Sequence, residues 1–371
     1  MSLSKSTSNG ETVKKDLNSK TENSDTTIVI PNATSHKKSE GSLESLELTL
    51  SPSQITPKEN ENYQGLNANN SEIKQSNDNS PSRQQTKFPY FQIGVSEDRN
   101  KRCRRTMEDA HSFFYDFAGV EGQGFFAIFD GHAGKQAAEW CGSHFHETFQ
   151  QVLQKNTHRS IPEVFHLAFL EADKELNQSA GKHSGCTAIA AFLRTEEIKD
   201  SEVTNGKENT PQATTASEIV ESKKKSKRVL YTANVGDARA VLCRDGKAIR
   251  LSYDHKGSDA QEAKRITDAG GFVMNNRVNG VLAVTRSLGD SSMKEFVVGN
   301  PYTTETILTE KDPFLILACD GLWDVCEDQD AVDLIKGFTD PQIASKNLLD
   351  HALQNFSTDN LSVMVVRLMN G

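Results

Sequence analysis

Apolar residues follow two different periods along residues 88–371, and each period predicts a different kind of element. Recurrence every three or four residues, which places apolar side chains on one helix face, predicts helices over residues 133–153, 161–176, 259–271 and 341–356. Short apolar or alternating runs bounded by turn residues predict strands over residues 125–130, 186–194, 229–236, 238–244, 247–252, 314–319 and 361–368. Several strands follow one another without a helix between them, which favours antiparallel sheets and helices in separate layers. The pattern therefore predicts an α+β fold.

Glycine and proline mark several element boundaries. Pro341 suits the first position of a helix, where its missing N–H costs no hydrogen bond. Gly270 and Gly271 suit a helix end, because a left-handed residue commonly terminates a helix. Asp245 and Gly246 separate two short alternating segments, as the two-residue turn of a hairpin does.

The remaining sequence divides the chain into a tail and one folded domain. Residues 1–87 are rich in Ser, Thr, Asn, Lys, Glu and Gln, with Tyr63 as their one aromatic residue and no cysteine. Such a segment buries too little apolar surface to offset the entropy of ordering, so we expect it to be disordered. Residues 195–228 also contain few apolar residues, and we expect a flexible surface insertion between two strands.

The charge of the chain is acidic and lies mainly in the folded part. Of 42 basic and 51 acidic residues, 10 and 11 lie in the first 87 positions, which leaves a net charge of −8 for residues 88–371. This charge repels phosphate backbones, so we expect no nucleic-acid partner. The basic run KKKSKR at 223–228 is either a solvated charge run or a nuclear localisation signal.

The cysteines and the N-terminus indicate the compartment. Six cysteines have no C-x-x-C spacing, and several lie in apolar runs, so we expect free thiols in a reducing environment. The first residues lack the apolar core of a signal peptide, and about 18 consecutive apolar residues occur nowhere. We therefore expect a soluble cytoplasmic protein without a membrane partner, and the basic run leaves the nucleus open as a second location.

Acidic residues gather at the ends of the predicted strands. Two of them, Asp130 and Asp320, follow an apolar run directly and precede a glycine. Asp-Gly is also a common turn dipeptide, so each pair alone has a purely structural explanation. The full set comprises Glu108, Asp109, Asp130, Asp237, Asp320, Asp324 and Asp359. If the strand ends converge, these carboxylates stay charged only when cations compensate them.

The residue types also select the cation and the chemistry. Oxygen-only ligands suit Mg²⁺ or Mn²⁺ rather than structural zinc. The glycines after Asp130 and Asp320 allow close backbone approach, so a carbonyl can join the coordination. Two such ions can activate a water molecule towards a phosphoryl group.

Two further residue types beside the acids fit phosphoryl chemistry. Arg104 or Arg105 offers a planar group that matches phosphate oxygens. His132, adjacent to a predicted ligand, can protonate a leaving oxygen. Taken singly, an arginine is more often a surface charge and a histidine more often a structural donor, but their position beside the acids favours the functional interpretation.

An ordered set of motifs resembles a known family. The motifs are RRTMEDAH, FAIFDGHAG, SGCTA, NVGDARAVL, DHK, AGGFVMNNRVNGVLAVTRSLGD, ACDGLWD and TDN. Together they resemble the metal-dependent type 2C protein serine/threonine phosphatases, the PPM family, over residues 93 to about 368, and especially its small fungal members. Each motif alone is modest, whereas the ordered set is specific. Cys186 stands where many relatives have serine.

The resemblance implies a fold and a metal site. The fold would be a β-sandwich of two antiparallel sheets flanked by helices, in four αββα layers. One ion would be held by Asp130, Asp320 and Asp359, and the other by Asp130, the Gly131 carbonyl and Glu108, with Asp109 acting through water. Asp237 and Asp324 would contribute to a third, weaker site. Arg104 would bind the substrate phosphate, and His132 would be the general acid.

The resemblance also implies a reaction and its substrates. A hydroxide bridging two ions of Mg²⁺ or Mn²⁺ would hydrolyse phosphoserine and phosphothreonine in proteins, without a phosphoenzyme. We expect a monomer that acts on phosphoproteins, with components of MAP-kinase cascades as plausible substrates. Four Ser/Thr-Pro dipeptides, at residues 51, 56, 80 and 210, are either targets of proline-directed kinases or chance occurrences.

Two other classes of function compete with this interpretation. A catalytically inactive member could bind phosphoproteins as a scaffold, since a fold alone does not guarantee activity, although every acid of the motif set is present together with Arg104 and His132. A metal-dependent nuclease would need a basic groove, which the acidic charge of residues 88–371 disfavours.

Overall fold

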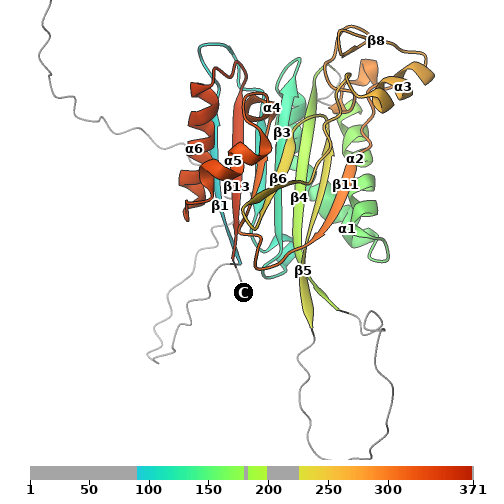
Figure 1. Cartoon of the computed structure of the whole chain (residues 1–371). Coiled ribbons are helices and arrows are strands. Elements are labelled where there is room, and N and C mark those ends of the chain that lie inside the picture. The colour runs from blue at the N-terminus through green and yellow to red at the C-terminus, as the bar shows by residue number, and fades with distance from the viewer. Residues whose placement is uncertain (1–89, 179–182, 199–224, 370–371) are drawn as a thin grey trace, which may run out of the picture. The chain divides into compact units, whose positions relative to one another are not determined.

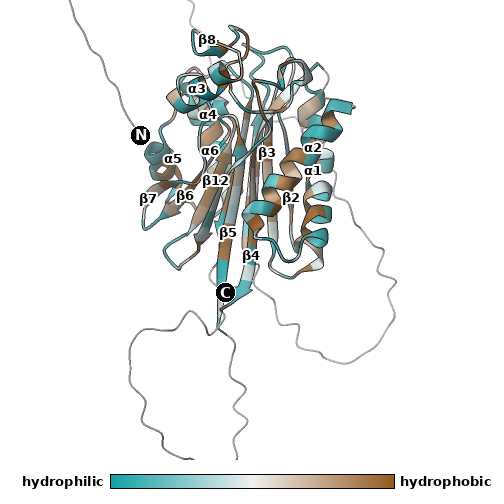
Figure 2. Cartoon of the chain, turned by 90° about the vertical axis from the view of Figure 1, so that its right-hand side faces the viewer, coloured by the Kyte–Doolittle hydropathy of each residue, from teal (hydrophilic) through white to brown (hydrophobic). Residues whose placement is uncertain are grey.

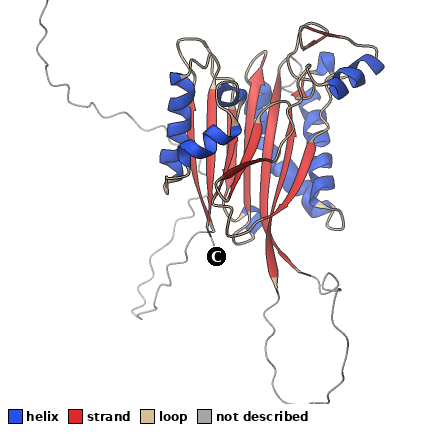
Figure 3. Cartoon of the chain, in the orientation of Figure 1, coloured by secondary structure: helices blue, strands red, loops and turns tan. Residues whose placement is uncertain are grey.

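Two antiparallel sheets pack face to face, and helices cover the outer face of each (Figures 1 and 3). The structure is a computed structural model, which describes residues 90–178, 183–198 and 225–369. The predicted α+β fold with four αββα layers is confirmed. The predicted tail, residues 1–87, and all four Ser/Thr-Pro dipeptides lie outside the described residues. Among the described helices, none combines the length and apolar composition needed to cross a bilayer.

The first sheet has five strands, and three helices cover its outer face. Its strand order is β1 (Phe91–Asp98), β13 (Leu361–Leu368), β12 (Phe314–Ala318), β6 (Arg239–Arg244) and β7 (Lys247–Arg250). The covering helices are α4 (Asp320–Trp323), α5 (Asp328–Ile335) and α6 (Pro341–Gln354). The predicted hairpin turn between β6 and β7 is present, with positive φ at Asp245 (54°) and Gly246 (76°). Asp340 caps α6, and Pro341 begins it as predicted.

The second sheet has six strands, and two long helices cover it. Its order is β11 (Tyr302–Ile307), β5 (Ser226–Val235), β4 (Gly185–Glu197), β3 (Gly124–His132) and β2 (Ala110–Phe114), and β10 (Leu288–Gly289) pairs with β4. The helices are α1 (Gln136–Lys155) and α2 (Ile161–Gln178). Beside this sheet lie α3 (Ala260–Asp268) and the hairpin of β8 (Val273–Met274) and β9 (Arg277–Val278) (Figure 1). Two short 3-10 turns lie at Phe117–Gly119 and Ser291–Met293.

Strand alternation divides the apolar residues into three layers. In β3, Phe125 and Phe129 pack against α1 and α2, whereas Phe126 and Ile128 pack between the sheets. This division follows from the period of two in a strand, which sends successive side chains to opposite faces. Figure 2 shows the apolar colouring concentrated along the strands. All six cysteines are free, and five are buried as small apolar residues, as predicted.

The predicted boundaries of the insertion are wrong at both ends. Thr195, Glu196 and Glu197 pair with residues 226–228 and extend the β4–β5 ladder. The Tyr231 hydroxyl donates a hydrogen bond of 2.8 Å to Glu196, which joins the two strands by a side-chain contact as well. Polar composition concealed this extension, because side chains that face solvent need not be apolar. Residues 199–224 of the predicted insertion lie outside the described residues.

Candidate metal centre

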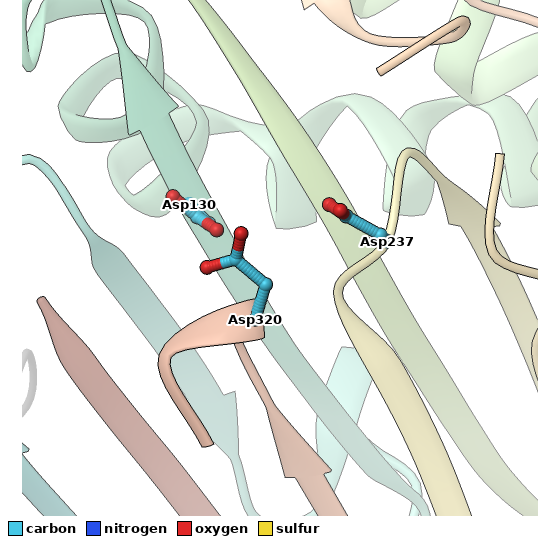
Figure 4. A group of neighbouring side chains, drawn as sticks. All are labelled: Asp130, Asp237 and Asp320. Atoms are coloured by element: carbon cyan, nitrogen blue, oxygen red, sulfur yellow. The ribbon is translucent and has the colours of Figure 1, made fainter. Parts of the chain in front are cut away.

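Three aspartates from separate elements meet at one end of the sandwich (Figure 4). Asp130 lies in β3, Asp237 lies in the turn between β5 and β6, and Asp320 begins α4. One carboxylate oxygen from each lies within 4.8 Å of the other two. The convergence of acids that the strand ends predicted is therefore present.

Strand alternation places Asp130, and the end of β12 places Asp320. Phe126 and Ile128 point from β3 into the core between the sheets, so the same period puts Asp130 next on that face. On β12, Leu317 points into the same core, and the chain turns into α4 at Asp320, three residues later. An apolar strand ends on a carboxylate in each case because the strand runs out of the core into the site.

Burial and mutual repulsion make the charged forms of these aspartates costly. Burial raises the pKa of Asp130 well above its ordinary value, and the nearby charges of Asp320, Asp109 and Asp237 raise it further. Burial likewise raises the pKa of Asp320 well above its ordinary value, with the charge of Asp237 as the next cause. A carboxylate group of this kind favours either protons or bound cations. Divalent ions would keep it charged at neutral pH.

Asp109 is a fourth acid directed at this region. Its side chain is buried, and its Oδ2 has no hydrogen-bond partner in the described chain. Burial raises its pKa to about 6, and its charge raises the pKa of Asp130. A buried carboxylate oxygen without a partner is rare and indicates a site for a bound ion or water molecule. Such an oxygen fits the role predicted for Asp109 near a metal ion.

Asp359 joins the site from the loop before β13. Burial raises its pKa, and its charge raises the pKa values of both Asp130 and Asp320. The Arg104 guanidinium forms an ion pair with its carboxylate and donates a hydrogen bond of 3.1 Å to the carbonyl of Thr358. The structure therefore places Arg104, the arginine preferred by the motif match, beside a predicted metal ligand.

Glu108 and Gly131 touch through their backbones. A Cβ atom on Gly131 would lie 2.3 Å from the Glu108 carbonyl oxygen, so only glycine allows this approach. The Glu108 carboxylate accepts hydrogen bonds from the Gly134 N–H (3.0 Å) and from the Thr106 hydroxyl (2.9 Å). The two segments predicted to hold the second ion are therefore fixed side by side.

Asn360 holds the Glu108 loop in place, a role that the sequence analysis missed. Its Oδ1 accepts a hydrogen bond of 2.9 Å from the Glu108 N–H. Its Nδ2 donates to the carbonyls of Arg99 (2.8 Å) and Thr106 (3.0 Å). The side chain is buried. The TDN motif contained this residue, but an amide after a candidate ligand gives no sequence signal for a loop more than 200 positions away.

The residues present fit hard divalent ions. The three closest donors are all carboxylate oxygens, the ligand type that Mg²⁺ and Mn²⁺ prefer. The unpartnered Oδ2 of Asp109 supplies a further buried oxygen. The close approach at Gly131 brings a backbone segment into the same region. A single proton would neutralise only one of these carboxylates, whereas divalent cations can compensate the charge of several.

Lys256 lies at the residues predicted for a third site. Its ammonium nitrogen is 3.3 Å from an oxygen of Asp237 and 3.3 Å from an oxygen of Asp324. Burial lowers the pKa of Lys256, but the two carboxylates outweigh burial and raise it overall. The DHK motif contained this residue, and the sequence analysis gave it no role. The structure assigns it as an internal cation of the acidic site.

His132 contacts an acid that the sequence analysis did not single out. Its Nε2 lies 2.7 Å from Oδ2 of Asp290, which follows β10. Asp290 ends the SLGD motif, 158 residues further along the chain. No spacing rule connects the two positions, because their contact depends on the pairing of β10 with β4.

The structure brings all of the predicted site residues to one end of the sandwich. Electrostatic coupling, hydrogen bonds or backbone contacts connect Arg104, Glu108, Asp109, Asp130, Gly131, Asp237, Asp320, Asp324 and Asp359. His132 extends from the end of β3, two residues after Asp130. Their individual roles as ligands, phosphate-binding residue and general acid stay predictions.

The fold and the acidic site agree with one class of protein, the phosphatases. The family model described as "Protein phosphatase 2C" matches residues 93–361. A solved structure of a phosphatase from Toxoplasma gondii superposes with a TM-score of 0.59 at 26% sequence identity, covering 76% of this chain and 94% of that one.

Curated relatives give the same result at higher identity. "Protein phosphatase 2C homolog 1" of Saccharomyces cerevisiae is 48% identical over 283 residues, covering 76% of this chain and 95% of the yeast protein. Its counterpart of the same name in Schizosaccharomyces pombe is 45% identical over 285 residues, covering 76% of this chain and 75% of that protein. The chain therefore belongs to the protein phosphatase 2C family, and it is a serine/threonine protein phosphatase.

Proposed function

We propose that this phosphatase uses two divalent ions, Mg²⁺ or Mn²⁺, to hydrolyse phosphoserine and phosphothreonine in proteins. The observation that carries the proposal is the meeting of Asp130, Asp237 and Asp320 oxygens within 4.8 Å. Burial and repulsion raise the pKa values of all three carboxyl groups. Cation binding relieves this repulsion, so the site would gain affinity for metal from the same electrostatics that disfavour the bare charges.

The ligand assignment follows the motif match and the positions of the residues. Asp130, Asp320 and Asp359 would hold one ion, and Asp130, the Gly131 carbonyl and Glu108 the other. Asp109 would act through water, and Asp237 with Asp324 would take a third ion more weakly. When bound, the ions supply an activated water molecule as nucleophile and neutralise charge on the phosphoryl group.

Two side chains of the chain itself would handle the substrate. Arg104 would bind phosphoryl oxygens, since its guanidinium is about half exposed and already held next to Asp359. His132 would donate a proton to the serine or threonine oxygen as it leaves, because an alkoxide is a poor leaving group without a proton. Neither role requires a covalent intermediate on the protein.

The physiological substrates would be phosphorylated proteins of kinase pathways, including MAP-kinase cascades. The family resemblance supports this part of the proposal, together with an acidic domain that disfavours nucleic acid as a substrate. We also propose that the protein acts as a monomer in the cytoplasm, with the nucleus as a second location. Capture of phosphoproteins from cell extract by an Asp320→Asn variant, compared with the unmodified chain, tests the substrate class.

A direct assay tests the reaction. The full chain should release phosphate from a phosphothreonine peptide with Mn²⁺ or Mg²⁺ and should lose this activity in EDTA. The Asp320→Asn variant should be inactive under the same conditions. Normal turnover in EDTA would refute the metal requirement. Phosphopeptide binding without turnover would favour a scaffold, and faster cleavage of single-stranded DNA than of phosphopeptide would favour a nuclease.

A further inference from the structure

Strand pairing brings His132 and Asp290 together across an intervening glycine. His132 in β3 pairs with Gly185 in β4, and Gly185 pairs with Gly289 in β10. Asp290 follows Gly289 immediately. The three strands therefore place the imidazole and the carboxylate on either side of the same backbone position.

Gly185 leaves the space that this contact occupies. A Cβ atom on Gly185 would lie 2.1 Å from Oδ2 of Asp290 and 2.5 Å from Nε2 of His132. Any side chain at this position would separate the two groups. The 2.7 Å contact between Nε2 and Oδ2 therefore depends on a glycine in β4, the central strand of the three.

The segment that carries Asp290 is itself held by buried hydrogen bonds. The Gly289 N–H donates to Asp173 (2.9 Å), and the Asp290 N–H donates to the carbonyl of Ser184 (3.1 Å). Lys294 contacts the same Asp173 carboxylate at 2.9 Å. The Ser287 hydroxyl donates to Oδ2 of Asp290 at 2.5 Å. Because these contacts hold the backbone beside Asp290 and one oxygen of its carboxylate, the carboxylate offers a rigid acceptor for the ring.

A rigid carboxylate determines which imidazole nitrogen carries the proton. Burial raises the pKa of Asp290, but hydrogen bonds from His132 and Ser287 outweigh burial and lower it overall. An ionised carboxylate only accepts hydrogen bonds, so the facing Nε2 of His132 carries a hydrogen. The other nitrogen, Nδ1, is then the atom that remains for proton transfer.

We propose that Asp290 is a positioning residue that fixes the ring orientation and tautomer of His132, so that Nδ1 delivers the proton to the leaving group. This inference rests on the proposed function. In the step, water forms a new bond to phosphorus while the bond from phosphorus to the serine or threonine oxygen breaks. The attacking water gives one proton to solvent, and the leaving oxygen keeps the electron pair and receives the Nδ1 proton of a His132 ring that begins the step protonated on both nitrogens. His132 is left neutral with its Nε2 hydrogen on Asp290, and solvent restores the Nδ1 proton.

The chain offers a matched pair of variants for the test. Asp290 has φ 52°, and Asp245 in the β6–β7 hairpin has φ 54°. Asparagine tolerates this left-handed conformation, so both Asp290→Asn and the control Asp245→Asn should fold. At residue 290 the amide can turn its NH₂ group towards Nε2, which then accepts a hydrogen bond and carries no hydrogen, so the doubly protonated ring that delivers a proton from Nδ1 is disfavoured. The corresponding change in a serine protease triad likewise reverses the tautomer of its histidine.

Comparing two substrates distinguishes the loss of a positioned proton donor from a general loss of activity. With Mn²⁺, Asp290→Asn should lower kcat for a phosphothreonine peptide about 10- to 100-fold, with KM within about twofold. Its kcat for p-nitrophenyl phosphate should stay within about threefold, because p-nitrophenolate leaves without a proton. Combining the change with His132→Gln should add no further loss. Parallel losses on both substrates, or additive losses in the double variant, would overturn the proposal.

A spectroscopic measurement tests positioning independently of activity. In full-length protein labelled with ¹⁵N-histidine and brought to alkaline pH, the His132 signals, assigned with His132→Gln, should show that the ring left after loss of its second proton carries its hydrogen on Nε2. Asp290→Asn should shift them towards the Nδ1-protonated form, and Asp245→Asn should not. An unchanged tautomer in Asp290→Asn would overturn the proposal. If the unmodified chain hydrolyses neither substrate, the proposed phosphatase reaction fails, while the tautomer result still decides the positioning role.

Discussion

The ammonium nitrogen of Lys256 lies 3.3 Å from a carboxylate oxygen of Asp237, at the acidic end of the sandwich. The same nitrogen lies 3.3 Å from Asp324. Lys256 therefore supplies positive charge from the chain itself to a group of carboxylates that repel one another. The charge of this lysine lowers the pKa values of Asp237 and Asp320, against the effect of burial.

Replacing Lys256 by methionine should destabilise the protein in EDTA. The substitution leaves the buried Asp237 without its cation, and half-exposed pairs of this kind contribute about 1–2 kcal/mol. Millimolar Mn²⁺ should restore most of the loss, because a divalent ion can take over the neutralisation. Urea denaturation with and without Mn²⁺ measures both effects.

Lys264→Met is the control for Lys256→Met. The ion pair of Lys264 with Asp268 is exposed on one helix face, so removing it should lower the free energy of unfolding by less than about 0.5 kcal/mol. Equal losses for the two variants would contradict the role of Lys256.

Replacing Asp320 by asparagine should stabilise the protein in EDTA at pH 8 while abolishing activity with Mn²⁺. The change removes one of several repelling charges, so the free energy of unfolding should rise by about 1 kcal/mol or more. Asp312→Asn provides the contrast, because Asp312 is buried and pairs with Arg244 at 2.7 Å. Removing the Asp312 charge leaves Arg244 without its partner and should lower the free energy of unfolding by about 2–4 kcal/mol. Urea denaturation of both variants decides the sign, and destabilisation by Asp320→Asn would contradict the electrostatic account.

Asp109 should make stability fall as pH rises in EDTA. Burial raises its pKa from 3.8 to about 6 in the folded protein, so the folded state holds a proton that the unfolded state has lost. Relative to Asp109→Asn, the unmodified chain should lose up to about 3 kcal/mol of stability between pH 4 and pH 7.

The comparison with Asp109→Asn isolates this effect from other titrating groups. His255 acts in the opposite direction, since burial lowers its pKa to about 4 and its contribution to stability grows as pH rises towards 6.5. Subtracting the two unfolding curves cancels the His255 contribution. A difference that does not change with pH would show that Asp109 has an ordinary pKa.

Replacing Gly131 by alanine should damage both the fold and metal binding. The new Cβ atom would lie 2.3 Å from the Glu108 carbonyl oxygen, and backbone cannot move aside as easily as a side chain. We expect a loss of about 2–3 kcal/mol and a weaker response to Mn²⁺ in thermal unfolding. At Gly337 an added Cβ meets nothing within 4 Å, so Gly337→Ala should change stability by less than about 0.5 kcal/mol. Similar losses at both positions would contradict the tight contact at Gly131.

The sequence predicted the elements whose apolar pattern is long and regular. The helices at 133–153 and 341–356 and the strands at 314–319 and 361–368 occur within a few residues of the predicted bounds. The prediction that Asp130 and Asp320 meet also succeeded, because each one interrupts an apolar run at a point where the strand leaves the core.

Short or polar elements gave no usable pattern. β10 has two residues, and β11 (YTTETI) is mostly polar and partly exposed, so neither shows a clear apolar period. The pairing of β10 with β4 is what brings Asp290 to His132. Contacts of this kind depend on which strands become neighbours, and a local pattern of residues does not contain that information.

The most direct test of the metal centre is an anomalous-scattering map from crystals of the full chain grown with Mn²⁺. Manganese peaks should lie within coordination distance of Asp130 and Asp320 carboxylate oxygens, and crystals of Asp130→Asn should lose these peaks. A well-ordered acidic end with no manganese beside Asp130, at Mn²⁺ concentrations that support full phosphatase activity, would contradict the proposed metal site.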